Sequence, residues 1–288
     1  MNLKHLSSTK LSWTVKNQPY RLKYFYKKLF LVNDRYLICV SNLGECLCFD
    51  MAEKKVVWVD MDYHKYNDSY SFVTHEHTVL HKGIMFSGRD DKDFAAQDIE
   101  TGKILWKFYA GSGSDTFNSN FSFHDGKVLF HSKRSTNCVD MESHKLVWKL
   151  KFTADLGSEN GVVWNNYYIV QSVSRNNPTL NYINIDTGEV ERQIKLTSEY
   201  SDNAKVVGMS YADVFPWGDQ IWYKSRNGHI CCIDLVKGER IEVAFKGCGC
   251  TDPWAIGSAD HIILNDKMYM LAVGGGLEHG WYKFGQDM

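Results

Sequence analysis

The sequence predicts an all-β fold, a six-bladed β-propeller built from four-stranded blades. The first observation is a recurring motif, a polar residue followed by a turn and a strand, which reads D-I-E-T-G-K-I-L-W at residues 98–106. The second observation is its spacing, because the six copies begin at residues 5, 50, 98, 140, 184 and 234. A period of about 40 to 50 residues made of short strands is typical of propeller blades.

Each interval between motif copies contains four predicted strands, recognised by alternating apolar and polar residues. In one interval they are residues 120–124, 127–131, 137–141 and 146–150, with turn-forming residues between them. The other complete units follow the same order, with strands at residues 29–32, 36–41, 45–50 and 56–59, at 77–81, 84–87, 94–99 and 104–109, at 161–165, 167–172, 180–185 and 191–196, and at 212–217, 220–224, 229–235 and 240–245.

The last unit is one strand short, because it offers only residues 261–265, 267–273 and 280–284. The first motif copy, residues 5–13, stands alone at the other end of the chain, with a strand at residues 10–16. We therefore predict that the N-terminal strand completes the C-terminal blade and closes the ring, which removes open sheet edges. Residues 1–288 then form a single propeller domain.

A tryptophan ends the motif in four copies. Because large aromatic side chains at a fixed repeat position supply apolar contact area, we expect them to pack between adjacent blades. The four are Trp13, Trp58, Trp106 and Trp148.

Bulk properties exclude several classes of function. The net charge of −1 gives no general attraction to nucleic acids or anionic membranes. The N-terminus lacks the pattern of a signal peptide, and no uninterrupted apolar run approaches twenty residues, so we expect a cytoplasmic protein. The eight cysteines lie mostly in apolar strand patterns, and we expect buried thiols without disulfides in a reducing compartment.

The motif D-x-x-T-G-x-x-x-W, clearest at residues 98–106, resembles the PQQ-like (quinoprotein-like) repeat family of β-propellers. This resemblance implies the fold, and it implies a binding platform without a quinone, as in most members of that superfamily. The quinoprotein dehydrogenases of the superfamily carry a disulfide between adjacent cysteines. Here Cys231 and Cys232 lie in a strand pattern, where successive side chains point to opposite faces, so we expect no such bridge and no cofactor.

The loops that join one blade to the next are predicted to bind a partner. Function in propellers lies on such loops, and these are rich in acidic and aromatic residues. The predicted partner-binding residues are Asp60, Asp62, Tyr63, Asp68, Asp115, Asp155, Glu159, Asp202 and Trp254.

The hairpins between second and third strands carry an arginine in four units. Several guanidinium groups on one rim could hold a phosphate or carboxylate. The alternative is that each arginine lies in a solvated turn or pairs with an aspartate of the adjoining acidic loop. The four candidate anion-binding residues are Arg89, Arg134, Arg175 and Arg226.

No catalytic motif is present: the sequence has no G-x-S-x-G, no H-E-x-x-H and no G-x-x-x-x-G-K-[ST]. The pairs Cys248 with Cys250 and His75 with His77 lack the spacing of zinc ligands, so no metal is expected. We therefore predict a protein without enzymatic activity.

The functional hypothesis is a monomeric, protein-binding propeller. Its acidic loops suit a basic partner, since complementary charge speeds association, and one specific version is a bacterial immunity protein that covers a toxin such as a nuclease. The alternatives are a sensor or enzyme that uses the channel mouth and the four arginines for a small anionic ligand, or an assembly scaffold.

Overall fold

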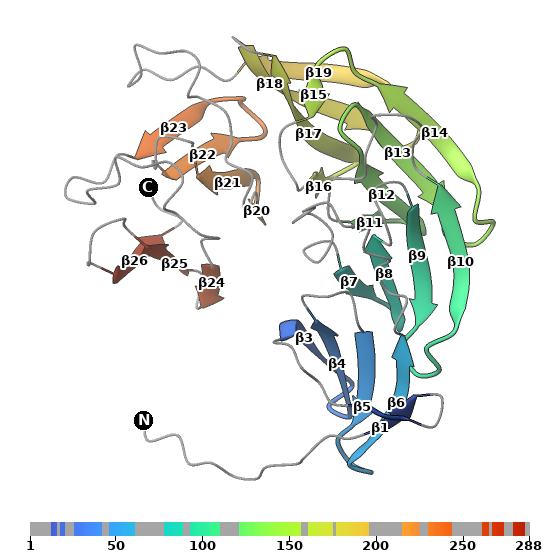
Figure 1. Cartoon of the computed structure of the whole chain (residues 1–288). Coiled ribbons are helices and arrows are strands. Elements are labelled where there is room, and N and C mark those ends of the chain that lie inside the picture. The colour runs from blue at the N-terminus through green and yellow to red at the C-terminus, as the bar shows by residue number, and fades with distance from the viewer. Residues whose placement is uncertain are drawn as a thin grey trace. The chain divides into compact units, whose positions relative to one another are not determined.

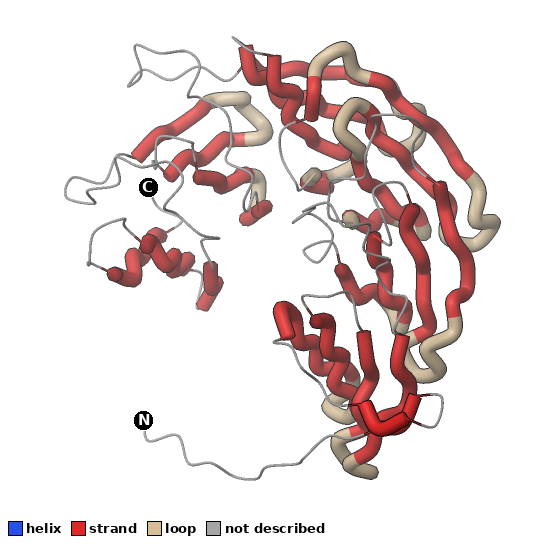
Figure 2. The backbone as a smooth tube through the Cα atoms, viewed as in Figure 1, coloured by secondary structure: helices blue, strands red, loops and turns tan. Residues whose placement is uncertain are grey.

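The computed structural model describes residues 13–15, 18–20, 26–41, 46–60, 78–88, 93–109, 121–156, 161–174, 177–195, 215–224, 230–243, 261–264, 267–273 and 279–285. In these segments the chain forms strands and turns without a helix (Figure 2). Accordingly, no helix in the described part of the chain has the length and apolar character needed to cross a membrane. Contacts divide the chain into two compact units, residues 1–118 and 119–288.

The described residues of unit 1 (residues 1–118) form two four-stranded antiparallel sheets and one short hairpin (Figure 1). Blade 1 consists of β3 (Tyr26–Val32), β4 (Tyr36–Ser41), β5 (Cys46–Asp50) and β6 (Lys55–Asp60). Blade 2 consists of β7 (Thr78–His81), β8 (Ile84–Gly88), β9 (Asp93–Asp98) and β10 (Ile104–Tyr109). The hairpin consists of β1 (Trp13–Val15) and β2 (Gln18–Tyr20).

The described residues of unit 2 (residues 119–288) form four sheets (Figure 1). Blade 3 consists of β11 (Ser122–His124), β12 (Lys127–His131), β13 (Ser135–Asp140) and β14 (Leu146–Lys151). Blade 4 consists of β15 (Asp155–Leu156), β16 (Val162–Trp164), β17 (Tyr167–Ser174), β18 (Asn177–Asn184) and β19 (Val190–Lys195), with both β15 and β16 paired to β17.

The remaining sheets of unit 2 are blades 5 and 6. Blade 5 consists of β20 (Phe215–Trp217), β21 (Gln220–Lys224), β22 (Ile230–Asp234) and β23 (Arg240–Val243). Blade 6 has three strands, β24 (His261–Leu264), β25 (Lys267–Val273) and β26 (His279–Gly285). The predicted all-β propeller fold and its strand order are thus confirmed.

Ring closure by the N-terminal strand is not confirmed. β1 pairs with β2, with Trp13 opposite Tyr20, and the sheet of blade 6 contains only β24, β25 and β26 among the described strands. Completion of the last blade by the N-terminal strand therefore stays a prediction.

Apolar side chains pack blade 1 on blade 2 in unit 1, and they pack blade 4 on blades 3 and 5 in unit 2. Ile38, Val40 and Cys48 of blade 1 pack on Met85 and Ile99 of blade 2. In unit 2, one core joins Leu129 and Cys138 of blade 3 to Tyr168 and Ile183 of blade 4, and another joins Ile169 and Tyr182 to Ile221 and Ile233 of blade 5. In blade 4, alternation along the strands sends successive residues to the two neighbouring blades of the unit, as a stack of sheets requires.

The cysteines are part of this packing. Cys39, Cys46, Cys48, Cys138 and Cys232 are buried, and none of these five forms a disulfide. Burial raises the pKa of Cys39 to about 11 and those of Cys48 and Cys138 to about 12, so these three remain thiols at neutral pH. Cys232 belongs to the adjacent pair Cys231 and Cys232, and it is a free thiol.

Candidate functional site: the turn face

Each blade has two ends, and the recurring motif forms one of them. We call this end the turn face: it carries the turn between the first and second strands and the turn between the third and fourth strands. A backbone hydrogen bond joins the two turns in all five blades that have the motif, from the N–H of Met51, Ile99, Met141, Ile185 and Leu235 to the carbonyl of Arg35, Gly83, Gly126, Asn166 and Asp219, respectively.

The first residue of the motif closes its own turn. The Asp98 carboxylate accepts hydrogen bonds from the Thr101 N–H at 2.8 Å and the Thr101 hydroxyl at 2.6 Å. In the other four copies, the first side chain likewise accepts a hydrogen bond from a backbone N–H group. These side chains belong to Asp50, Asp140, Asn184 and Asp234. These are the side chain to backbone bonds that make Asp and Asn favourable turn residues. The polar residue that opens the motif is therefore structural.

The fifth residue of the motif has a left-handed backbone in every described copy. Its φ is 70° at Gly102, 75° at Gly188 and 79° at Gly238, and it is also positive at Lys54 and His144. A second reason favours glycine at the two positions that face a tryptophan. A Cβ on Gly102 would lie 2.5 Å from Cγ of Trp58, and a Cβ on Gly188 would lie 2.7 Å from Cγ of Trp148. Only a residue without a side chain leaves room for the indole of the preceding blade.

The last residue of the motif binds the next blade. The indole N–H of Trp58 donates to the carbonyl of Ile99 at 2.8 Å, and that of Trp148 donates to the carbonyl of Ile185 at 2.7 Å. The residue before the tryptophan forms a β-bulge in the outer strand. In blade 1, Trp58 pairs with Cys48 and Val56 pairs with Phe49, so the residue between Val56 and Trp58 is the extra one. The prediction that these tryptophans pack between blades is confirmed for Trp58 and Trp148.

Arg192 replaces the tryptophan at the junction of blades 4 and 5. Its guanidinium donates to the carbonyls of Leu235 at 2.9 Å and Val236 at 3.2 Å, and it stacks over the Tyr182 ring at 5.1 Å. The copy at residues 184–192 therefore keeps the junction although it lacks the aromatic residue.

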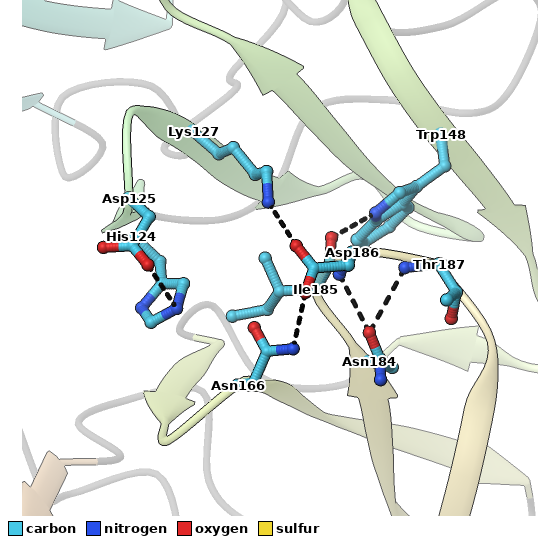
Figure 3. Close-up of polar contacts among 9 residues, drawn as sticks. All are labelled: His124, Asp125, Lys127, Trp148, Asn166, Asn184, Ile185, Asp186 and Thr187. Atoms are coloured by element: carbon cyan, nitrogen blue, oxygen red, sulfur yellow. Dashed lines mark hydrogen bonds and ion pairs between the residues drawn. The ribbon is translucent and has the colours of Figure 1, made fainter.

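An ion pair reinforces the junction of blades 3 and 4. Figure 3 shows Lys127 of blade 3 and Asn166 of blade 4 both pointing toward the Asp186 carboxylate, beside the hydrogen bond from Trp148 to Ile185. The bonds from Lys127 and Asn166 lower the pKa of Asp186, and the bond to Asp186 raises the pKa of Lys127. This carboxylate stays charged well into the acidic range.

The turn face of unit 2 is acidic. Among the described residues, its exposed acidic side chains are Asp125, Glu142, Asp186, Glu189, Glu191, Asp219 and Glu239. Its exposed lysines are Lys145 and Lys237, while Lys127 and Arg192 are half-buried and bound to Asp186 and to backbone carbonyls. Acidic side chains thus outnumber basic ones among the described residues of this face. They were not predicted from the sequence, because they are spread over three copies of the repeat.

Two of the predicted partner-binding residues, Asp60 and Asp155, lie at the opposite end of the blades, which we call the loop end. Asp60 ends β6 and accepts a hydrogen bond from Gln97 at 3.4 Å. Asp155 lies in β15. The other predicted residues, Asp62, Tyr63, Asp68, Asp115, Glu159, Asp202 and Trp254, lie outside the described residues.

Arg134 is the one candidate anion-binding arginine within the described residues. Its Nε donates to Asp155 at 2.7 Å, and Lys133 lies 3.6 Å from the same carboxylate. This contact lowers the pKa of Asp155 and corresponds to the alternative in which the arginine pairs with an aspartate of the adjoining loop. Arg89, Arg175 and Arg226 lie outside the described residues. No cluster of metal-ligating side chains occurs among the residues that the structure describes.

Comparison with known proteins identifies the family. Residues 13–243 match the family described as outer membrane protein assembly factor BamB. The chain belongs to this family of PQQ-like β-propellers. Among solved structures, BamB from Moraxella catarrhalis is similar with a TM-score of 0.61 and 16% identity, over 88% of this chain and 71% of that one.

Two further proteins are similar to this chain. Quinohemoprotein alcohol dehydrogenase from Comamonas testosteroni is similar with a TM-score of 0.56 and 12% identity, over 84% of this chain and 50% of that one. A BTB/POZ domain-containing protein of Acanthamoeba polyphaga mimivirus is 22% identical over 138 residues, which are 46% of this chain. The match covers only 23% of that viral protein.

Proposed function

We propose that this member of the BamB-like propeller family is a non-enzymatic protein-binding module whose turn face in unit 2 receives a basic protein. The acidic character of that face, with Glu142, Glu189 and Glu239 exposed on successive blades, carries the proposal. Complementary charge raises the association rate of two proteins and rejects partners of the same charge.

The rigidity of the face supports the same function. Each turn is closed by its own aspartate or asparagine and by a backbone bond between the two turns of the blade. A turn whose backbone is already held in place does not have to be ordered when a partner binds, which favours affinity. The family description, an assembly factor, also fits a module that acts by binding other proteins.

The specific version that we favour is a cytoplasmic immunity protein of a bacterium. A basic toxin, such as a nuclease that must attract phosphates, offers the positively charged active site that an acidic face would cover. Such a protein needs no cofactor and no catalytic residues of its own.

The test compares two charge-reversal variants that change the net charge equally. Glu142→Lys with Glu189→Lys alters the turn face of unit 2, and Glu53→Lys with Glu100→Lys alters that of unit 1. Each tagged protein is used to capture partners from the native source, and the association rate of the captured protein is measured against salt. We expect the unit 2 variant to slow association by about tenfold or more and the unit 1 variant to behave like the wild type.

Equal capture by all three proteins would overturn the proposed face. The immunity version has its own test, in which the chain is co-expressed with the product of the neighbouring gene in a host that this product kills. Growth rescue by the wild type and by the unit 1 variant, with loss of rescue in the unit 2 variant, is the expected result. Failure of the wild type to rescue growth would contradict the immunity version. The proposed binding face would then be tested by the capture experiment alone.

A further inference from the structure

We propose that the junction of blades 4 and 5 is the part of the acidic turn face that binds an arginine side chain of the partner protein. The site consists of the rings of Trp164 and Tyr167 and the carboxylates of Glu191 and Asp219, and we call it the junction site. The inference rests on the proposed function, because it names the side chain that the same face recognises.

Two aromatic rings flank the turn between β16 and β17. Trp164 ends β16, Tyr167 begins β17, and the two residues pair across the hairpin. Their rings are stacked, with the centroids 6.3 Å apart and an angle of 21° between the ring planes. Both side chains pack on the core between blades 4 and 5, yet both residues are only half-buried. Part of each aromatic residue is therefore exposed at the turn face.

The buried ring of Tyr182 holds this pair in place. It meets the Trp164 ring edge to face, with the centroids 6.4 Å apart and the planes at 84°. It meets the Tyr167 ring in the same way, at 6.0 Å and 76°. The two outer rings therefore have a fixed orientation before a partner binds, which reduces the entropy that binding costs.

A carboxylate lies at the edge of each outer ring. The indole N–H of Trp164 donates to Asp219 at 3.0 Å, and the hydroxyl of Tyr167 donates to Glu191 at 2.8 Å. The Asn184 amide also donates to Glu191 at 2.8 Å. All three donors are neutral, and within the described part of the chain neither carboxylate forms an ion pair. Both carboxylates belong to exposed residues, so a cation of a partner can reach them.

The repeat itself does not require the aromatic pair. The turn between the first and second strands is also present in blades 2, 3 and 5, where other residues flank it. The equivalent pairs are His81 with Ile84, His124 with Lys127, and Trp217 with Gln220. Closure of the turn therefore does not explain why blade 4 has a tryptophan and a tyrosine there.

Arg192, at the same junction, shows which cation suits such rings. Its guanidinium carbon lies 5.1 Å from the centroid of the Tyr182 ring, and its N–H groups donate to the carbonyls of Leu235 and Val236. A planar guanidinium can stack on a ring and donate hydrogen bonds at the edge of that ring, whereas a lysine ammonium is a compact charge. Tryptophan is also the aromatic residue that attracts cations most strongly. The combination of rings and edge carboxylates therefore favours arginine.

The test follows the indole N–H signal of Trp164 by NMR during titration with a peptide of alternating arginine and glycine. Trp164→Phe assigns this signal by removing it. We expect the signal to move to saturation with the arginine peptide. A peptide with citrulline in place of arginine should bind about tenfold more weakly, because citrulline has a similar shape without the charge. A lysine peptide should bind about threefold more weakly than the arginine peptide.

Three conservative variants separate the charge of the junction site from its hydrogen bonds. Glu191→Gln removes one carboxylate but leaves the bond between Trp164 and Asp219 intact, and it should lower the affinity about threefold. Glu142→Gln makes the same change of charge on blade 3 and should leave the affinity nearly unchanged, since physiological salt screens exposed charges over about 8 Å. Tyr167→Phe keeps the ring and the carboxylate and should bind like the wild type.

The proposal is wrong if the citrulline peptide binds as tightly as the arginine peptide, or if Glu142→Gln or Tyr167→Phe weakens binding as much as Glu191→Gln. Equal affinity for the lysine peptide would overturn the assignment of arginine. The acidic face as a whole fails by a different result, equal capture of the partner by the charge-reversal variants. The failure of this inference and the failure of the proposed function can therefore be told apart.

Discussion

The junction between blades 3 and 4 and the junction between blades 4 and 5 satisfy equivalent backbone carbonyls with different side chains. Trp148 gives one N–H to Ile185 and packs its indole on Gly188, whereas Arg192 gives hydrogen bonds to Leu235 and Val236 and stacks on Tyr182. Both junctions therefore keep a side-chain N–H that donates a hydrogen bond to the next blade. An indole supplies this N–H at one junction and a guanidinium supplies it at the other.

The largest expected difference between the junctions comes from truncating each donor. Trp148→Ala removes the hydrogen bond and a large packed ring, and we expect a loss of about 3 kcal/mol in the free energy of unfolding. Arg192→Ala removes hydrogen bonds and stacking but little apolar area, and should cost about 1 to 2 kcal/mol. Urea unfolding of both variants measures this, and equal losses would show that the indole contributes no packing beyond its N–H.

The second largest effect on stability is expected at Gly188, the glycine that makes room for the indole of Trp148. Gly188→Ala places a Cβ 2.7 Å from Cγ of Trp148, and should cost about 2 to 3 kcal/mol through overpacking and the positive φ. Gly126 is the matched control, because it has a φ of 74° but no atom lies within 4 Å of the place that its Cβ would occupy. Gly126→Ala should cost only about 1 kcal/mol. Similar losses in both variants would remove the steric part of the explanation.

The motif copies that lack glycine offer a smaller, stabilising change. Lys54 has a φ of 52° at the position that Gly102, Gly188 and Gly238 occupy in other copies. Lys54→Gly should raise the free energy of unfolding by about 0.5 to 1 kcal/mol, since the left-handed conformation is costly for a residue with a Cβ. The neighbouring Lys55→Gly lies in β6 and should instead lower it by a similar amount. A loss in both variants would mean that the strain at Lys54 is negligible.

The ion pair beside Trp148 predicts the smallest effect, a dependence on pH. The pKa of Asp186 is lowered in the folded protein by Lys127 and Asn166, so its contribution to stability is present above the ordinary carboxyl pKa of about 4 and is lost as pH falls through the lowered value. Asp186→Asn should therefore be less stable than the wild type at neutral pH, and the gap should close below about pH 4. A gap that is the same at pH 3 and pH 7 would contradict this.

The sequence predicted the frame well, because the frame depends on local patterns. The strands at residues 36–41, 127–131, 220–224 and 267–273 agree with the structure to the residue, since alternation and turn residues define them. It missed that Arg192 completes a junction, because an arginine in place of a tryptophan looks like loss of the motif. Only the carbonyls of Leu235 and Val236, distant in sequence, show what the guanidinium does.

The functional surfaces were harder to predict for a related reason. The hairpins between second and third strands differ in length, since one joins Gly88 to Asp93, another joins His131 to Ser135, and a third joins Ser174 to Asn177. Arginines that look equivalent in the sequence therefore lie in hairpins of different length. The acidic turn face escaped notice because its carboxylates belong to separate repeats, and each one alone is an ordinary turn residue.

The backbone bond that joins the two turns of each motif-bearing blade has a consequence for how this protein changes over generations. Because main-chain atoms and one aspartate or asparagine hold each turn, the neighbouring positions can exchange acidic, basic and neutral residues without loosening the sheet. The described turns of unit 1 place Glu53 and Glu100 beside Lys54, Lys55 and Lys103, while those of unit 2 are dominated by carboxylates. Selection can therefore change the charge of the turns in a few blades, and with it the choice of partner, while the fold stays the same.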